Sequence, residues 1–221
     1  MRGKLRRFSE NESRYNVLQP GKDIYEAIKG KWNSEYFKNE NDIIIELACG
    51  RGEYTIGMAR MFADKNFIGV DIKGDRIWKG SGFGIEEKLG HVAFLRTEII
   101  LLEKFFADHE ISDIWITFPD PRPRDRDEKR RLTSPRFLDI YKRLLKPGGI
   151  VRLKTDNTGL YEYTLEILQE RDDITNLHFT NDLYYSDLKP ECYDIRTRYE
   201  QKFNDQGHDI KYLRFEFNPN Q

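Results

Sequence analysis

The sequence predicts an α/β fold: a mostly parallel sheet of seven strands with helices on both faces. Short apolar runs alternate with helical patterns from about residue 42 onward, which is typical of βαβ units and a parallel sheet. The first of these runs leads into a glycine turn, and several of the others end in an acidic residue. At 221 residues the chain is long enough for one domain with a substantial core.

Seven segments have the length and composition of strands. In chain order they are DIIIELACG (42–50), NFIGVDI (66–72), HVAFLRTE (91–98), ISDIWITFPD (111–120), IVRLKTD (150–156), ITNLHFT (174–180) and DIKYLRFEF (209–217). We expect the last strand to be antiparallel, and the residues from about 181 to 209 to form a polar excursion before it.

Helices are expected between the strands. The apolar spacing indicates them at 53–65, 134–149 and 160–171, and Ser134–Pro135 is a start signal for the second. The segment 73–90 should also be helical by its position. Because Gly80, Gly82 and Gly84 weaken a helix, we expect it to be broken or kinked there.

Two ranges describe the domain organisation. Residues 1–41 have little pattern and are expected to form a basic N-terminal arm and one helix, and residues 42–221 the main domain. The basic residues are clustered, as in proteins that bind a polyanion. MRGKLRRF opens the chain with four cations, and residues 122–131 hold six cations against three acids, although the net charge is only −1.

Composition excludes several classes of protein. No apolar stretch follows the N-terminal charges as in a secretory signal, and no run reaches the length of a membrane span. The two cysteines are far apart, and the four histidines lack metal-ligand spacing. We therefore expect a cytoplasmic protein with no metal and no membrane contact. The sequence leaves open whether it is a monomer or a homodimer.

The segment ELACGRGEY places Gly50 and Gly52 directly after a strand. It is not a dinucleotide fingerprint, because Thr55 replaces the third glycine, and it is not a P-loop, because no Lys-Ser/Thr follows. Glycines at this place let the backbone approach a ligand closely. A purely structural turn is the alternative. Cys49 within the loop is better explained as a small packing residue than as a nucleophile.

Acidic residues lie in or directly after the first three strands: Glu46, Asp71 and Glu98. Asp71 is about twenty residues beyond the glycine loop, where a carboxylate accepts the hydroxyls of a ribose. Glu98 is placed to accept from an adenine amino group. Such a rim favours a cationic cofactor without pyrophosphate, such as S-adenosylmethionine, over the phosphates that helix N-termini bind. The pattern resembles the Rossmann-like class I methyltransferases.

TFPDPRPRDRDEKRRL continues from the fourth strand and holds Asp120 between two prolines. Open α/β sheets present catalytic groups at such strand ends. Some amino-methyltransferases have Asn/Asp-Pro-Pro-Tyr here and stack the aromatic ring on the target base. Arg122 and Pro123 follow in this chain, so that aromatic residue is missing and methylation of an exocyclic amine is disfavoured.

Three segments in order, PDPRPRDRDEKRRL, LKPGGIVRLKTD and TRYEQKF, closely resemble the bacterial tRNA (guanine-N7)-methyltransferases from about Asp42 to the C-terminus. The chain departs from that family at Arg122, where Trp is usual, at Arg124 for Lys and at Asp127 for His. Glu98 stands where Asp or Asn is common. The Trp of that family is thus absent here, whereas the charge pattern of the segment is kept.

The resemblance implies roles for residues of this chain. It implies that Glu46, Gly50, Gly52, Asp71, Glu98 and Asp120 contact S-adenosylmethionine, with Asp120 catalytic. It further implies that the target nucleotide is bound by Arg124, Asp156, Thr197, Arg198, Tyr199 and Glu200, and the RNA by Arg126, Lys129, Arg130 and Arg131. The expected activity is methylation of N7 of guanine 46, in the variable loop of tRNA.

Guanine chemistry agrees with these roles. N7 carries an unprotonated in-plane lone pair, so methyl transfer needs alignment rather than a base. The product is cationic, and a carboxylate such as Asp120 stabilises that charge as it develops. An arginine at O6/N7, the usual pairing, would block the reacting atom. The base should therefore be held by its Watson–Crick donors, for which Asp156 and Glu200 are suitable acceptors.

Structural alternatives exist for each segment. Asp156 could cap the next helix, residues 126–131 could be a solvated loop, and residues 197–200 could be a polar loop with an incidental ion pair. Two other functions are also open, namely methylation of another base or a small molecule, and a non-catalytic RNA-binding module. The ordered set of motifs favours the tRNA methyltransferase.

Overall fold

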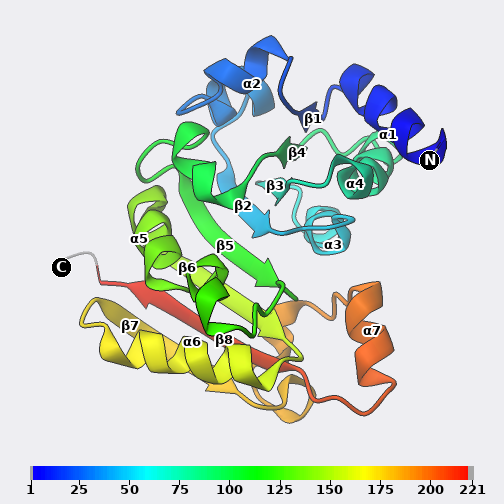
Figure 1. Ribbon diagram of the computed structural model, residues 1–221. Helices are drawn as coiled ribbons and strands as arrows, with labels where there is room; N and C mark the ends of the chain where they lie inside the picture. The colour runs from blue at the N-terminus through cyan, green and yellow to red at the C-terminus, as the bar shows by residue number, and fades with distance from the viewer. Residues whose placement is uncertain (1, 219–221) are drawn as a thin grey trace.

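The computed structural model describes residues 2–218. Met1 and residues 219–221, which the expected ranges 1–41 and 42–221 include, lie outside the described residues. In the part described, eight strands form one sheet in the order β1-β4-β3-β2-β5-β6-β8-β7 (Figure 1). They are β1 (Val17–Leu18), β2 (Asp42–Leu47), β3 (Lys65–Asp71), β4 (Val92–Arg96), β5 (Ile111–Thr117), β6 (Leu145–Thr155), β7 (Ile174–Thr180) and β8 (Lys211–Phe217).

The strand directions follow the expected mostly parallel pattern. Neighbours pair in parallel from β1 through β6, whereas β8 is antiparallel to both β6 and β7. The seven expected strands and the reversed last strand are confirmed. The eighth strand, β1, comes from the N-terminal forty residues and extends the sheet beside β4.

Helices cover both faces of this sheet (Figure 1). The α-helices are α1 (Arg2–Ser13), α2 (Asp23–Ala27), α3 (Glu53–Met61), α4 (Gly74–Glu86), α5 (Pro135–Leu144), α6 (Thr158–Glu170) and α7 (Arg198–Asn204). The shorter helical segments are the π-helix η1 (Trp32–Phe37) and the 3-10 helices η2 (Ile99–Lys104), η3 (Asp125–Arg130), η4 (Leu183–Tyr185) and η5 (Lys189–Cys192). The expected polar excursion therefore contains η4, η5 and α7.

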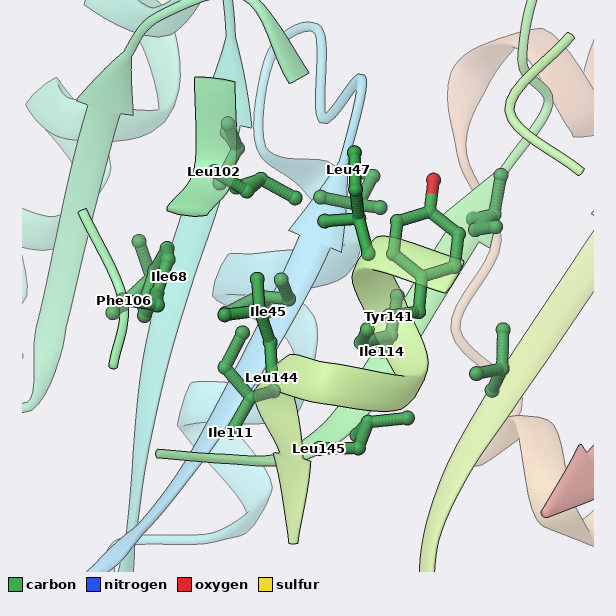
Figure 2. Close-up of a cluster of buried hydrophobic side chains, with 14 of the residues drawn as sticks. Ile45, Leu47, Ile68, Leu102, Phe106, Ile111, Ile114, Tyr141, Leu144 and Leu145 are labelled. Carbon is green, nitrogen blue, oxygen red and sulfur yellow. The ribbon is translucent and has the colours of Figure 1, made fainter. Parts of the chain in front are cut away.

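Alternation along the strands divides the buried side chains into two cores. Ile43, Ile45 and Leu47 of β2 join α5, α6 and η2 in one core, whereas Ile44 faces the other way and packs with α3 and α4. Since successive strand residues point to opposite faces, each strand supplies both cores. Figure 2 shows part of the first core, where β2 and β5 meet Tyr141 and Leu144 of α5.

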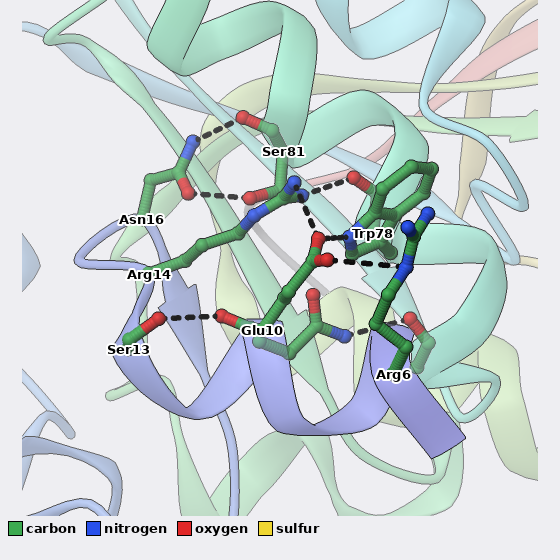
Figure 3. A network of polar contacts seen from close by, with 9 residues as sticks. Arg6, Glu10, Ser13, Arg14, Asn16, Trp78 and Ser81 are labelled. Carbon is green, nitrogen blue, oxygen red and sulfur yellow. Dashed lines mark hydrogen bonds and ion pairs between the residues drawn. The ribbon is translucent and has the colours of Figure 1, made fainter. Parts of the chain in front are cut away.

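The first forty residues differ from the expected arm with one helix. α1 packs across α4, where the Trp78 indole N–H donates to Glu10 and the Trp78 carbonyl accepts from Arg14 (Figure 3). Asn16 Nδ2 donates to the Ser81 carbonyl at 3.0 Å, and the Asn11 side chain donates to the Gly74 carbonyl at 2.7 Å. These partners lie more than sixty residues away, so local sequence does not reveal them.

The expectation of a broken helix at 73–90 is wrong, because α4 runs unbroken from Gly74 to Glu86. Its glycines serve close packing. A Cβ at Gly80 would lie 2.6 Å from the Arg51 carbonyl oxygen and from the Phe94 ring, so the helix can lie against the glycine loop only without a side chain there. The intrinsic weakness of glycine is offset by this tertiary contact.

β2 lies between β3 and β5, where the chain order along the sheet reverses direction. Open α/β sheets bind ligands at the carboxyl ends of the strands beside such a reversal. The segments that leave β2 and β5 are the glycine loop and the loop holding Asp120. The topology therefore brings these two predicted motifs to one edge.

Candidate active site

Two pockets open at the carboxyl edge of the sheet. The first, which we call the Asp71 pocket, has a volume of about 540 Å³ and is lined by Asp71, Glu98 and Asp120 among others. The second, the Thr197 pocket, has a volume of about 500 Å³ and is lined by Glu46 and by residues 197–199. Ala48, Arg76 and Phe118 line both pockets, so the two are neighbours with a common wall.

Asp71 is held rigidly at the end of β3. One carboxylate oxygen accepts from the Gly50 amide at 2.9 Å and the other from the Lys73 amide at 2.8 Å. The side chain is thereby tied to the glycine loop and to the start of α4. Its remaining lone pairs can accept two further donors, as a ribose diol requires.

The rest of the Asp71 pocket suits an adenine ring. Ile72, although apolar, is 52% exposed and lines the pocket with Ile99 and Ile100. Glu98 is exposed at its rim. The Thr97 hydroxyl is buried and has no hydrogen-bond partner, a state that costs free energy unless a ligand satisfies it. Apolar walls with a few convergent polar groups are what a nucleoside site needs, so these residues fit S-adenosylmethionine.

The two glycines of the loop have different roles. Gly50 has φ +55°, and a Cβ there would meet only the Ala48 carbonyl oxygen at 3.9 Å, so this side of the loop is open. Gly52 has φ +68°, but a Cβ there would lie 2.5 Å from the Phe94 ring. Gly50 thus suits close approach of a ligand, whereas Gly52, expected at the cofactor, is needed for packing.

Glu46 is buried rather than exposed at the rim. One carboxylate oxygen accepts from the Thr55 amide at 2.8 Å and its hydroxyl at 2.5 Å, and the other accepts from the Thr117 hydroxyl at 2.6 Å. Burial raises the pKa of Glu46 to about 7, although these hydrogen bonds oppose the shift. Thr55, which breaks the dinucleotide fingerprint, thus has the positive role of fixing Glu46.

Asp120 is an exposed residue at the end of β5. Its side chain is 63% exposed and forms an ion pair with Arg122 Nε at 3.2 Å. An exposed pair of this kind contributes little to stability. Because the Asp120 carboxylate is exposed and lines the Asp71 pocket, a ligand in that pocket can reach it. Where the resembled family usually has Trp, this chain has a cation beside the predicted catalytic carboxylate.

The cationic residues from Arg124 to Arg131 comprise four exposed side chains and one that packs against the protein. Lys129 and Arg130 are exposed and line the Asp71 pocket, and Arg124 and Arg126 line a neighbouring hollow with Asp120. Arg131 differs from them: its Nε donates to the Arg122 carbonyl at 3.1 Å, and its guanidinium lies 4.2 Å from the Tyr163 ring centroid. Arg131, predicted to bind RNA, is engaged in packing.

Residues 197–200 begin α7 with a capping box. The Thr197 hydroxyl accepts from the Glu200 amide at 3.0 Å, and Glu200 Oε2 accepts from the Thr197 amide at 3.2 Å. Glu200 is fully buried, lies 2.6 Å from Lys154 Nζ and accepts from the Tyr184 hydroxyl. In this arrangement the Glu200 carboxylate holds α7 on the sheet and does not face a pocket.

Tyr199 presents an aromatic face at the Thr197 pocket. It is 47% exposed, stacks on Phe203 with ring centroids 4.3 Å apart, and lies 5.4 Å from Phe118. Burial, and then the neighbouring Asp156 carboxylate, raise the pKa of Tyr199. Asp156 is not the helix cap, because Asn157 Oδ1 accepts from the Leu160 amide at 2.8 Å. The Asp156 carboxylate thus lies beside Tyr199 and does not cap α6.

Several residues of the site were not predicted from the sequence. Thr97 and Arg76 line the pockets, Thr117 holds Glu46, and Lys154 is the buried partner of Glu200. Only Lys154 had a signal, namely a cation inside a strand that otherwise reads as buried. Cys49 and Cys192 are buried, and burial raises the pKa of both thiols, so a nucleophilic role for Cys49 is unsupported.

Two further findings concern residues 2–218. No group of three or more His, Cys, Asp or Glu side chains there is arranged to hold a metal ion. Among the helices described, none is long and apolar enough to cross a membrane.

The fold is shared with solved methyltransferase structures. The 16S rRNA methyltransferase KamB superposes with a TM-score of 0.61 at 12% identity, covering 91% of this chain and 96% of that one. A structure described as that of an antibiotic-related methyltransferase gives a TM-score of 0.59 at 16% identity, over 82% and 90% of the two chains. Identities this low support the fold alone, and they confirm the Rossmann-like class I methyltransferase architecture.

Proteins with similar sequences show the family as well as the fold. Residues 40–213 match a family model described as "Putative methyltransferase". The tRNA (guanine-N(7)-)-methyltransferase of Cytophaga hutchinsonii is 52% identical over 99% of both chains. That of Christiangramia forsetii is 47% identical over 97% of both, and that of Bacteroides thetaiotaomicron 43% over 97% of this chain and 85% of its own. The chain belongs to the tRNA (guanine-N7)-methyltransferase family.

Proposed function

We propose that this protein transfers a methyl group from S-adenosylmethionine to N7 of guanine 46 in the variable loop of tRNA. The observation that supports this most directly is the common wall of the two pockets. A nucleoside-shaped pocket with acidic groups shares Ala48, Arg76 and Phe118 with a second pocket that presents an aromatic face. A cofactor in the first and a base in the second are thereby adjacent.

S-adenosylmethionine, when bound, supplies an electrophilic methyl group on a sulfonium centre. Asp71 accepts the ribose hydroxyls, Glu98 and the unpartnered Thr97 hydroxyl take the adenine edge, and Gly50 leaves room for close approach of the backbone. Asp71→Ala should weaken cofactor binding by about 1.5–3 kcal/mol, the range for hydrogen bonds to a charged group. Calorimetry on the folded variant checks this, and unchanged affinity would remove Asp71 from the site.

Tyr199 replaces the aromatic residue that the Asp120 loop lacks. A guanine in the Thr197 pocket would stack on the exposed Tyr199 face, as flipped bases do on aromatic side chains. Asp156 accepts from its Watson–Crick donors, which leaves N7 free. Because Glu200 is buried with Lys154, we assign it a positioning role rather than direct base contact.

Asp120 provides electrostatic stabilisation. N7 needs no general base, so the protein must align the two ligands and stabilise the purine as it becomes cationic. The exposed carboxylate of Asp120 lines the cofactor pocket at the end of β5 and is suited to this. Lys129 and Arg130, with Arg126 beside them, hold the RNA backbone, since phosphate contacts position a nucleic acid, and Arg124 contacts the target nucleotide.

A direct experiment tests the proposed function. The protein is incubated with unmodified tRNA and S-adenosylmethionine, and the nucleosides of the product are identified by mass spectrometry. We expect 7-methylguanosine, and its loss when guanine 46 is replaced by adenine in the transcript. Absence of 7-methylguanosine, or its persistence in that transcript, would contradict the proposal. Since the proposed substrate is tRNA, we also propose that the protein acts in the cytoplasm.

A further inference from the structure

A third pocket lies on the segment between β7 and β8, beyond the Thr197 pocket. It has a volume of about 330 Å³ and is lined by Tyr185, Lys189, Arg196 and Asn204 among others, and we call it the Tyr185 pocket. Arg196 directly precedes Thr197, and Asn204 ends α7. The consecutive residues Arg196 and Thr197 therefore line the Tyr185 pocket and the Thr197 pocket, respectively, and Asn204, about 10 Å away at the other end of α7, also lines the Tyr185 pocket.

Tyr185 is 94% exposed, the most exposed of the large hydrophobic side chains in the part of the chain described. Its neighbours hold it in place. Leu183 is 1% exposed and its amide donates to the Ile210 carbonyl at 2.7 Å, and the Tyr184 hydroxyl is bound to the buried Glu200. The ring of Tyr185 is thus presented to solvent from a fixed backbone.

The two cations of this pocket, Lys189 and Arg196, share it with the carboxylates of Asp182 and Asp209 but form no ion pair with them. Arg196 lies 4.4 Å from the Tyr184 ring centroid. Neither Arg196 nor Lys189 forms an ion pair within 4 Å with a carboxylate of residues 2–218. Two cations without an ion pair beside an exposed aromatic ring suit single-stranded nucleic acid, since the base stacks on the ring and the phosphate meets the cations.

The pocket also has hydrogen-bonding groups. Asn204 and Asp209 line it together with Tyr185. An amide and a carboxylate can pair with the edge of a stacked base, which a purely electrostatic surface cannot do. A pocket that only bound phosphate would need none of these groups.

We propose that the Tyr185 pocket is a second nucleotide site, which binds an unpaired nucleotide flanking the target guanine in the same tRNA. The base stacks on Tyr185, and its phosphate is held by Lys189 and Arg196. With the target base in the Thr197 pocket, two neighbouring nucleotides lie on either side of the Arg196–Thr197 backbone, and the start of α7 fixes the path of the strand. This inference rests on the proposed function.

Tyr185→Ala tests the site. Loss of one stacked base costs about 1–3 kcal/mol, so the dissociation constant for tRNA should rise roughly 5- to 150-fold. Tyr185→Phe should keep wild-type affinity, because the ring remains. Tyr15→Ala removes another exposed tyrosine, 60% exposed, and is the matched control. S-adenosylmethionine affinity should stay unchanged in all three variants.

Two more measurements locate the contact. Lys189→Ala should flatten the dependence of log K on log salt by about 0.7, the contribution of one phosphate contact on a single strand. Ultraviolet crosslinking followed by mass spectrometry should join the peptide around Tyr185 to a nucleotide next to guanine 46. Wild-type tRNA affinity in Tyr185→Ala would overturn the second site. If the wild-type protein formed no 7-methylguanosine, the proposed function itself would fail instead.

Discussion

The buried ion pair between Lys154 and Glu200 carries the largest expected effect of a single substitution. The two side chains are 1% and 0% exposed and their charged atoms lie 2.6 Å apart. Glu200→Gln keeps the shape of the side chain and removes its charge. Lys154 Nζ would then have only uncharged partners, namely the new amide oxygen, the Ile195 carbonyl at 3.3 Å and the Tyr54 ring, with its centroid 5.2 Å away.

The size of the effect follows from this burial. Removing one partner of a buried ion pair costs about 3–5 kcal/mol, because the other charge is left without compensation. In a domain of this length each kcal/mol shifts Tm by about 2–4 °C, so Tm should fall by roughly 6–20 °C. The double variant Lys154→Met/Glu200→Gln removes both charges and should recover most of this loss.

Thermal unfolding of the wild type, both single variants and the double variant measures the coupling. Glu87→Gln is the control, because it breaks the exposed Arg60–Glu87 pair and should cost less than about 1 kcal/mol. Below its Tm, Glu200→Gln should weaken tRNA binding through α7 and leave cofactor affinity unchanged. If Glu200→Gln were no more destabilising than Glu87→Gln, the pair would not hold α7.

Three further predictions concern the site. Asp120→Asn should lower the single-turnover rate at saturating tRNA more than it weakens tRNA binding, because its charge is needed as the purine becomes cationic; a full rate would make Asp120 a positioning residue. Lys129→Ala with Arg130→Ala should flatten the salt dependence of tRNA binding by up to ~2, whereas Arg131→Ala should lower Tm and leave the slope unchanged; the reverse pattern would contradict this division. Burial raises the pKa of Glu46 from 4.5 to about 7, so between these values the folded chain holds a proton that the unfolded chain lacks, and stability should fall as pH rises through this window. Glu46→Gln should therefore raise Tm more at pH 8 than at pH 5, and an equal change at both would contradict the shift.

The sequence alone determined the strands, their alternation with helices, and the acidic edge of the sheet. Period-two and period-3.6 patterns are local, and the carboxyl ends of parallel strands necessarily share an edge. Asp71 and Glu98 could therefore be assigned to one pocket without knowing any long-range contact. The motif order around Asp120 then sufficed to identify the family.

The tertiary structure decided which of these residues are exposed, and it did so through contacts between distant segments. Glu200 lies in a polar stretch but is buried, because Lys154 on β6 faces it. Gly80 weakens a helix locally but permits α4 to lie against Phe94. Arg131 belongs to a run of cations, yet Tyr163 on α6 covers it. Burial depends on partners that fold against a residue, and no local pattern encodes them.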